Sequence, residues 1–326
     1  MKLALVGYGY WGPNIAKNLK ASNKVEFVGI CELNAERLAR AKSVYENSIV
    51  YTDDYRDFLK DPSVDAIVVA TPTKASFTIV MDALDAGKHV FVEKPIAVSE
   101  ANAIAIKKKA DENKRIVHCD HIMLYHPVIR YVKTMMDQGE LGDLLYVDIS
   151  RINLGPLHKD VNALLDLAVH DIAVIDYLSG GEDIKRLEAM GHTCFGQQEA
   201  LTYLTIQYES FIAHIKSSWI SPVKERKTVI AGTKKMVVFD DVKSEKLTVY
   251  DRGFDPQMTE EYGSYEYHVR SGDIYIPHIP QEDALRNSIE HFVDCVKEQK
   301  ESLSGPVSSI RVMKVLDMAL EKLKES

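Results

Sequence analysis

The sequence predicts an α/β chain in two parts: an N-terminal, doubly wound parallel sheet and a C-terminal α+β domain with a large, open, mostly antiparallel sheet. Three observations predict this. The first 120 residues alternate short apolar runs with segments of helical spacing. After about residue 121, most apolar segments alternate with polar residues at the period of a strand. Finally, a glycine-rich stretch at 7–12 follows an apolar strand and precedes a helix.

The stretch 7–12 has the spacing GxGxxG. Gly7 allows the tight turn off the strand, Gly9 has no side chain to block a pyrophosphate, and Gly12 lets the helix pack close to the sheet. The start of the helix offers N–H groups and a positive dipole end to phosphates. This context predicts a Rossmann dinucleotide-binding domain, with Tyr10 and Trp11 as further cofactor contacts. A structural turn without a ligand is the alternative.

Glu32 bears on which dinucleotide binds. It ends a second apolar strand, about 20 residues after the glycines, where a carboxylate accepts hydrogen bonds from ribose hydroxyls. A carboxylate there repels a 2′-phosphate, so the sequence favours NAD over NADP. Arg37 lies a turn into the next predicted helix, where it either holds a phosphate or is a solvated helix residue.

The NAD-binding domain is predicted to span residues 1–120. Its expected strands and helices alternate along the chain. The strands are expected at 2–6, 25–30, 65–70, 89–92 and 115–119, and the helices at 13–21, 34–43, 74–86 and 99–113. Ser99 is expected to cap the last of these helices.

Residues 121–326 are predicted to form a substrate-binding and oligomerisation domain, with two closing helices that belong to it or pack back on the first domain. The expected helices are 127–138, 161–178, 282–298 and 306–324, and the expected strands are 144–151, 184–192, 201–208, 211–219, 227–231, 236–239 and 247–250. The segment 251–280 is rich in tyrosine and is expected to be irregular. Its residues Tyr262, Tyr265, Tyr267 and Tyr275 are assigned to a subunit contact or a loop.

Composition excludes several classes of protein. The net charge of −8 argues against nucleic acid as the main partner. Four widely spaced cysteines, with no CxxC pair, are typical of reduced thiols in the cytoplasm. The first strand begins at once, which leaves no room for a signal peptide, and no apolar run is long enough to span a bilayer. The exposed face of the open sheet predicts a homodimer or homotetramer.

Two groups of residues indicate catalysis. Ligands of a doubly wound sheet bind beyond the carboxyl ends of its strands, which places Glu93 and Lys94 at the nicotinamide end of the cofactor. Pro95, which follows, is a candidate for a cis peptide bond. Asp166 and His170 lie four residues apart on one face of a predicted helix. A carboxylate there can orient an imidazole that takes a proton from an alcohol, although a surface ion pair has the same spacing.

The chain resembles the GFO/IDH/MocA family of oxidoreductases over essentially its whole length. The matching segments, in order, are 7–12, Ala70-Thr71-Pro72, 86–90, 93–95, 166–170 and 290–292. The resemblance implies a Rossmann domain, a C-terminal domain with a large open sheet, and NAD or NADP as the cofactor, contacted also by Thr71 and Pro72. It implies Lys94, Asp166 and His170 as the catalytic residues.

Within the family, the pattern is most similar to nucleotide-sugar 3-dehydrogenases, such as those of UDP-N-acetylglucosaminuronate. The matching segments are 9–14, His121 with 124–127, 151–155 and 160–162. The implied substrate contacts are Lys94, His121, Tyr125, Arg151, Asn153, Asn162, Asp166 and His170. Two residues depart from the family pattern: Ser76 stands where histidine is usual, and Asp120 stands where glycine is usual.

Two further patterns allow competing interpretations. Arg151 suits a bidentate pair with a substrate anion or, equally, with a structural carboxylate. The run 118–121 (His-Cys-Asp-His) has metal-ligating residue types, but side chains of an extended segment alternate between faces, so no metal is predicted. His158 and Asp160, in the loop before the catalytic helix, are candidates to touch sugar hydroxyls.

The sequence therefore predicts an NAD-dependent sugar dehydrogenase that transfers hydride from a ring hydroxyl carbon, C3 of a nucleotide sugar, to nicotinamide. His170 takes the hydroxyl proton, Asp166 orients His170, and Lys94 stabilises the developing alkoxide. Three alternatives stay open: an NADPH-dependent 3-keto-sugar reductase, a dehydrogenase of a free polyol or monosaccharide, and a non-catalytic dinucleotide-sensing regulator.

Overall fold

The computed structural model describes residues 1–158, 161–196, 198–258 and 265–325, and the chain divides into two compact units. The first unit comprises Met1–His126 and Glu282–Lys314, and the second comprises Pro127–Gln281 and the residues from Val315 onward. The sequence places the division after residue 120 and leaves the place of the closing helices open. The structure assigns 282–314 to the first unit, because helix α8 (Ala284–Glu298) packs on its first helix.

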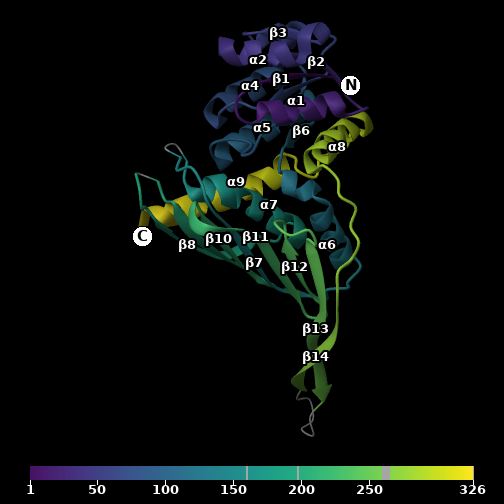
Figure 1. Cartoon of the computed structure of the whole chain (residues 1–326), viewed down its shortest axis with the longest axis vertical. Helices are drawn as coiled ribbons and strands as arrows, with labels where there is room; N and C mark the ends of the chain where they lie inside the picture. The colour runs from purple at the N-terminus through teal and green to yellow at the C-terminus, as the bar shows by residue number, and fades with distance from the viewer. Residues whose placement is uncertain (159–160, 197, 259–264, 326) are drawn as a thin grey trace. The chain divides into compact units, whose positions relative to one another are not determined.

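The first unit is built on a six-stranded parallel sheet with the order β3-β2-β1-β4-β5-β6 (Figure 1). This is the order of a dinucleotide-binding Rossmann fold, so the predicted fold class is confirmed. Its strands are β1 (Lys2–Val6), β2 (Glu26–Cys31), β3 (Val50–Thr52), β4 (Ala66–Val69), β5 (His89–Val92) and β6 (Val117–Cys119). All five strands expected from the sequence form within one or two residues of their predicted bounds.

The helices of the first unit are α1 (Gly12–Ala21), α2 (Ala35–Tyr45), α3 (Arg56–Lys60), α4 (Thr73–Asp85), α5 (Glu100–Asn113), α8 and the start of α9 (Pro306–Glu325), with short 3₁₀ turns at Glu46–Ser48 and Ile122–Tyr125. Side chains cap the starts of three of these helices, including α8, where Asp283 accepts hydrogen bonds from the backbone of Leu285 and Arg286. Asn34 accepts a hydrogen bond from the backbone of Arg37, and Ser99 accepts one from the backbone of Asn102, as an N-cap does.

Strand β3 and helix α3 are not among the predicted elements. Strand β3 has only three residues, too few to show a period of two, and helix α3 has five. Strand β3 forms by pairing with β2, in a register that places Val50 beside Gly29. A local sequence pattern does not contain that long-range pairing.

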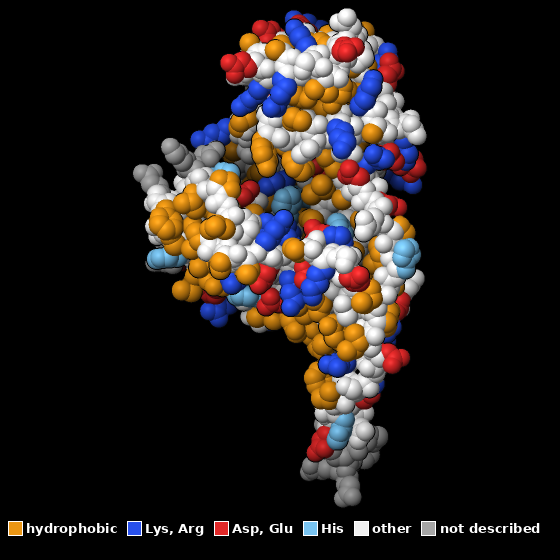
Figure 2. Space-filling model, viewed as in Figure 1, with side chains coloured by type: hydrophobic (Ala, Val, Ile, Leu, Met, Phe, Trp, Pro, Cys, Tyr) orange, Lys and Arg blue, Asp and Glu red, His pale blue; other side chains and the backbone are white. Residues whose placement is uncertain are grey.

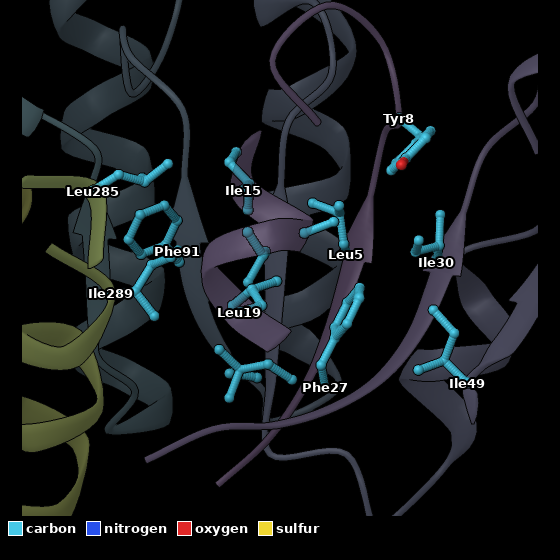
Figure 3. Packing of buried hydrophobic residues seen from close by; sticks show 14 of the residues in the cluster. Leu5, Tyr8, Ile15, Leu19, Phe27, Ile30, Ile49, Phe91, Leu285 and Ile289 are labelled. Atoms are coloured by element: carbon cyan, nitrogen blue, oxygen red, sulfur yellow. The ribbon is translucent and has the colours of Figure 1, made fainter. Parts of the chain in front are cut away.

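The core of the first unit includes residues from distant parts of the chain (Figure 3). Ile15 and Leu19 of α1 lie beside Phe91 of β5, and Leu285 and Ile289 of α8 close the same cluster. All five are at most 3% exposed. Full burial of such a side chain stabilises the fold by about 1.5–3 kcal/mol, so α8 is held in this unit mainly by its apolar face.

The second unit contains an eight-stranded sheet with the order β14-β13-β12-β11-β7-β10-β9-β8. Among the described residues, β7 and β10 pair in parallel and the other neighbours pair antiparallel, which confirms a mostly antiparallel sheet. The strands are β7 (Leu144–Leu154), β8 (Ile184–His192), β9 (Leu201–Tyr208), β10 (Ile212–Ser218), β11 (Ile220–Gly232), β12 (Met236–Asp240), β13 (Leu247–Met258) and β14 (Tyr265–Tyr275).

The helices of this unit are α6 (Pro127–Asp137), a π-helical turn at Leu164–Ala168, α7 (Val169–Ser179) and the end of α9. The sequence predicts one regular helix over 161–178. The helix instead contains a π turn, so its first part has a different hydrogen-bond pattern from its second. Across the described chain, no helix combines the length and apolar character needed to cross a bilayer.

One face of the eight-stranded sheet is open. Strand β9 alternates buried and more exposed residues, and the register places its exposed Tyr203 opposite Met190. On the same face Ile212 pairs with Tyr146. These four side chains are 39–68% exposed, so they form an apolar area on the free face of the sheet.

The prediction of an irregular segment over 251–280 is wrong for most of its described residues. Strand β13 continues to Met258 and pairs with β14 in a two-stranded ribbon, and apolar side chains are visible along it (Figure 2). Tyr267, Val269 and Ile274 are 52–73% exposed. Within 251–257 and 266–275, Gly253 is the only buried residue, so this part of the sequence lacks the alternation that identifies a strand. Tyr262 lies outside the described residues.

Candidate active site

The first unit contains a cavity of about 1070 Å³ at the carboxyl edge of its parallel sheet. Ligands of doubly wound sheets bind at this edge. Most of the predicted cofactor contacts share this cavity. Those that line it are Gly7, Gly9, Tyr10, Trp11, Glu32, Arg37, Thr71, Pro72 and Glu93.

Each of the three glycines is needed for a different structural reason. Gly7 has φ of +101°, and a Cβ atom there would lie 2.4 Å from the carbonyl oxygen of Ala70. A Cβ atom at Gly12 would lie 2.6 Å from the carbonyl oxygen of Gly7. A Cβ atom at Gly9 would meet nothing closer than a guanidinium nitrogen of Arg37, at 3.6 Å. Gly7 and Gly12 thus hold the turn together, and Gly9 keeps the cavity side free for a ligand.

Helix α1 begins directly after this turn. Trp11 precedes its first residue, and no side-chain hydrogen bond caps the helix start. The start of a helix carries N–H groups and about half a positive charge, which stabilise an anion. A pyrophosphate at Gly9 would therefore meet favourable electrostatics without a dedicated cationic side chain.

Glu32 is 8% exposed at the end of β2. Its carboxylate oxygens accept hydrogen bonds from the backbone N–H of Tyr8 at 2.7 Å and of Asn34 at 2.9 Å. The carboxylate therefore fastens the β2–α2 turn to the glycine turn. Arg37 is exposed and lines the same cavity, so charges of both signs surround the place where a ribose would lie.

The lining residues that the sequence did not predict include a run of four polar residues, Asp53, Asp54, Tyr55 and Arg56. They follow the unpredicted strand β3, whose carboxyl end lies at the same edge as that of β2. The signal was present as a short apolar run followed by two acidic residues, but three residues of strand are too few to recognise. Tyr55 is fixed by a 2.6 Å hydrogen bond from its hydroxyl to Asp82 of α4.

Ser76, one of the two departures from the family pattern, has a local role. Its side chain is 2% exposed, and its hydroxyl lies 2.9 Å from both the hydroxyl and the carbonyl oxygen of Thr71. These contacts hold the β4–α4 turn that presents Thr71 and Pro72 to the cavity. The smaller serine thus supports this wall from within the turn.

Glu93 and Lys94 directly follow strand β5, and the Lys94–Pro95 peptide bond is cis, as predicted. The carboxyl of Glu93 lies close to that of Asp120, which follows the neighbouring strand β6. Burial, and then the nearby charge of Asp120, raise the pKa of Glu93 well above its usual range. Burial likewise raises the pKa of Asp120 to about 7, and the hydrogen bond from Ser288 opposes this rise.

A chain of buried hydrogen bonds leads away from Asp120. The hydroxyl of Ser288 donates to Asp120 Oδ1 at 2.7 Å and lies 2.9 Å from Nε2 of His118. The other ring nitrogen, Nδ1, lies 2.9 Å from the hydroxyl of Ser302. Because Ser288 donates to the carboxylate, it accepts from His118 Nε2–H, which leaves Nδ1 to accept from Ser302. Every donor in this chain then points towards Asp120.

His121 and Tyr125, both predicted substrate contacts, are buried in the first unit at 1% and 4% exposure. The hydroxyl of Tyr125 lies 2.8 Å from that of Ser304, which makes it part of the polar core. Neither ring nitrogen of His121 has a hydrogen-bond partner. Burial and the positive charge of Lys94 lower the pKa of His121 to about 4, so this imidazole is neutral at physiological pH.

In the second unit, Asp166 lies in the π turn and His170 lies in the first turn of α7. The indole N–H of Trp219 donates to Asp166 Oδ2 at 3.1 Å, which fixes the carboxylate from the side of the sheet. Single π turns within helices occur frequently at functional sites. Asp166 and His170, four residues apart, thus lie on one helical segment as predicted, but the π turn widens the helix locally.

Arg151 forms a bidentate pair with Asp171 of α7, with three N···O distances of 2.6–2.9 Å. The two side chains are 12% and 2% exposed. The sequence left a substrate anion and a structural carboxylate open as partners, and the structure places the carboxylate there. The pair fastens α7, which carries His170, to strand β7.

The other predicted substrate contacts of this unit also have protein partners. Asn153 accepts a 2.6 Å hydrogen bond from Arg226. Asn162 is 4% exposed, donates to Glu199 at 2.9 Å, and accepts from the backbone of Leu165 as a cap of the helix start. Its burial gives no support to a direct substrate contact. His158 lies with its ring 5.2 Å from that of Trp219, and Asp160 lies outside the described residues.

The residues of the cavity fit a dinucleotide. The glycine turn leaves room at Gly9, the helix start suits a pyrophosphate, and Glu32 lies where a ribose is recognised. Within the described ranges, no group of three or more His, Cys, Asp or Glu residues is arranged to hold a metal ion. The cysteines at 31, 119, 194 and 295 are free thiols.

Comparison with known families places the chain. Residues 1–121 match the oxidoreductase family model GFO_IDH_MocA, described as an NAD-binding Rossmann fold, and residues 129–238 match the GFO/IDH/MocA C-terminal domain. The chain is therefore a member of the GFO/IDH/MocA family of oxidoreductases.

Three relatives illustrate the range of the family. An inositol 2-dehydrogenase of Salmonella typhimurium is 29% identical over 58% of this chain, and the match covers 57% of that relative. A scyllo-inositol 2-dehydrogenase (NAD(+)) of Bacillus subtilis is 25% identical over 92% of this chain and 87% of its own length. A UDP-N-acetylglucosamine 3-dehydrogenase of Acidithiobacillus ferrooxidans is 28% identical over 56% of both chains. Its solved structure has a TM-score of 0.84 at 21% identity, covering 100% of this chain and 98% of that one.

Proposed function

We propose that the protein is an NAD-dependent dehydrogenase that oxidises a ring hydroxyl of a sugar, at C3 of a nucleotide sugar. The observation that supports this most is the cavity of the first unit, which joins the glycine turn to Glu93 at the end of β5. When bound, the dinucleotide accepts a hydride from the carbon that bears the hydroxyl. The chain itself has to bind the cofactor, orient the sugar and manage the hydroxyl proton.

We propose that His170 accepts the hydroxyl proton and that Lys94 stabilises the negative charge that develops on the hydroxyl oxygen. A neutral imidazole accepts a proton from an alcohol, and a fixed cation stabilises the alkoxide that forms. Asp166 orients His170, and the hydrogen bond from Trp219 supports Asp166 in that role. Lys94 follows the carboxyl end of a central strand, where ligands of this fold bind.

A preference for NAD over NADP is part of the proposal. Glu32 contributes a negative charge at the cavity, and its two backbone hydrogen bonds prevent it from swinging away. A 2′-phosphate beside it would be repelled. Arg37 lines the same cavity and favours the phosphate, so the preference is the balance of two opposed charges.

A free polyol is the second candidate substrate. Two of the relatives described above are inositol dehydrogenases, one of them matched over 92% of this chain. The UDP-N-acetylglucosamine 3-dehydrogenase, in contrast, supports a nucleotide sugar. The resemblance in 9–14 and 151–155 favours the nucleotide sugar as the substrate.

The test is NADH formation, followed by absorbance, with a panel of UDP- and dTDP-sugars beside inositols and free monosaccharides. Turnover of a nucleotide sugar supports the proposal, and turnover of an inositol alone would favour the second candidate. Oxidation of NADPH by a 3-keto-sugar, without the forward reaction, would favour a reductase. Dinucleotide binding without any turnover would indicate a regulator.

A further inference from the structure

Glu93 and Asp120 form a carboxyl pair at the carboxyl edge of the first sheet. They follow the neighbouring strands β5 and β6, Asp120 is 2% exposed, and Glu93 lines the cofactor cavity with its Oε1 atom buried and without a hydrogen-bond partner among the described residues. Two carboxylates in contact repel each other strongly in apolar surroundings, so such a pair retains at least one proton. The pair is therefore a proton store in the cavity wall.

Few of the groups around the pair change their protonation state near neutral pH. Burial raises the pKa of the Cys119 thiol and lowers the pKa values of His118 and His121, so all three are neutral there. Lys94 contributes a positive charge, and Asp283 at the start of α8 contributes a negative one. Ser288 donates its hydrogen bond to Asp120 and thereby stabilises the ionised form.

The pair lies at the end of the cavity that suits nicotinamide. Glu32 and the glycine turn occupy the ends of β2 and β1, and Glu93 follows β5, two strands beyond β1. Strands are about 4.8 Å apart, so Glu93 lies roughly 10 Å beyond the glycine turn along the sheet edge. A dinucleotide whose adenosine ribose meets Glu32 extends its other half towards Glu93.

We propose that the Glu93–Asp120 pair distinguishes oxidised from reduced nicotinamide by releasing a proton when the oxidised cofactor binds. The inference rests on dinucleotide binding in this cavity, and it is independent of which sugar is oxidised.

The signs follow from electrostatics. The oxidised nicotinamide ring is a cation, so it favours the ionised pair and expels a proton to the buffer. The reduced ring is neutral and displaces water, so it favours the protonated pair and takes up a proton. Oxidised cofactor should then bind more tightly as the pH rises, and reduced cofactor more tightly as it falls.

The pKa shifts of the two carboxyl groups agree with this arrangement. Burial raises the pKa of Asp120 to about 7, while the pKa of Glu93 lies well above its usual range. The pair therefore loses its first proton closer to neutral pH than an exposed carboxyl group does. If the titration differs by about one pH unit between the two complexes, the ratio of the NAD⁺ and NADH dissociation constants changes about tenfold over the whole titration and about fivefold between pH 6 and pH 8.

The experiment is calorimetric titration of the full chain with NAD⁺ and with NADH between pH 6 and pH 9. Each titration is run in two buffers that differ in ionisation enthalpy, because the difference in heat counts the protons exchanged. Near pH 7 the wild type should release protons when NAD⁺ binds and take up protons when NADH binds. Asp120→Asn should abolish this difference.

Two further variants separate the pair from its surroundings. Ser288→Ala removes a hydrogen bond that stabilises the ionised Asp120, so it should move the proton release to higher pH and keep its size. Asp61→Asn removes an exposed carboxylate outside the cavity, whose pKa is lowered by a backbone hydrogen bond from Ser63. It should leave the proton count unchanged.

Equal proton counts for NAD⁺ and NADH in the wild type would overturn the inference, as would an unchanged difference in Asp120→Asn. If Asp120→Asn does not fold, the wild-type counts and the pH shift in Ser288→Ala decide. Binding of both dinucleotides without proton exchange would overturn the inference alone. Failure of either dinucleotide to bind would overturn the cofactor assignment as well.

Discussion

Replacing Asp171 with asparagine removes the charge that holds Arg151 in the interior of the second unit. The pair has three N···O distances of 2.6–2.9 Å, and the Asp171 side chain is 2% exposed. Removal of one partner of a buried pair costs about 3–5 kcal/mol, because the other charge stays buried. The Arg151 side chain is 12% exposed and regains some water, so we expect the lower end, about 3 kcal/mol.

The assay is calorimetric unfolding of Asp171→Asn, with Asp137→Asn as the matched control. Asp137 pairs with Lys133 on the surface, and its side chain is 60% exposed, so its loss should cost less than about 1 kcal/mol. At about 2–4 °C per kcal/mol, Asp171→Asn should lower Tm by roughly 6–12 °C. Equal Tm values for the two variants would refute the structural role of Arg151 and would favour the alternative that Arg151 binds a substrate anion.

Three other outcomes are expected. Glu32→Ala should narrow the difference between NADH and NADPH dissociation constants, because it deletes the repulsion of the 2′-phosphate; tighter NADPH binding by the wild type would contradict the NAD preference. His170→Asn should lower kcat about 100-fold and Asp166→Asn less, since only His170 accepts the proton; equal rates in a steady-state assay would contradict these roles. Light scattering should give a mass well above the 36.7 kDa chain, because Tyr203, Met190 and their neighbours leave an apolar area exposed; a monomer at micromolar concentration would contradict this.

Much of the first unit could be predicted because its signals are local. Apolar runs bounded by glycine and by capping residues such as Ser99 define strands and helices without tertiary information. Strand β3 and the β13–β14 ribbon could not be predicted, because one is three residues long and the other, within 251–257 and 266–275, has Gly253 as its only buried residue. The packing of α8 on α1 depends on contacts about 270 residues apart, such as Ser22 with Glu290.

The cofactor cavity was predictable for a similar reason, because the GxGxxG turn and Glu32 lie within one local unit. The substrate contacts were harder, since a polar residue can meet a ligand or another residue of the chain. Arg151 meets Asp171, and Asn162 meets Glu199, 37 positions away. No local pattern states whether such a distant partner exists. The sequence shows that Asp120 departs from the family pattern, but its proximity to Glu93 depends on the fold and is not visible in the sequence.

The central claim is that Lys94 stabilises charge during oxidation of a sugar hydroxyl. The most direct measurement is the single-turnover rate of NADH formation by Lys94→Met, with saturating NAD and the sugar found in the panel, and Lys107→Met on the exposed side of α5 as control. We predict a loss of about 100-fold or more for Lys94→Met, with an unchanged NAD dissociation constant, and a normal rate for the control. A normal rate for Lys94→Met would contradict the assignment of the active site.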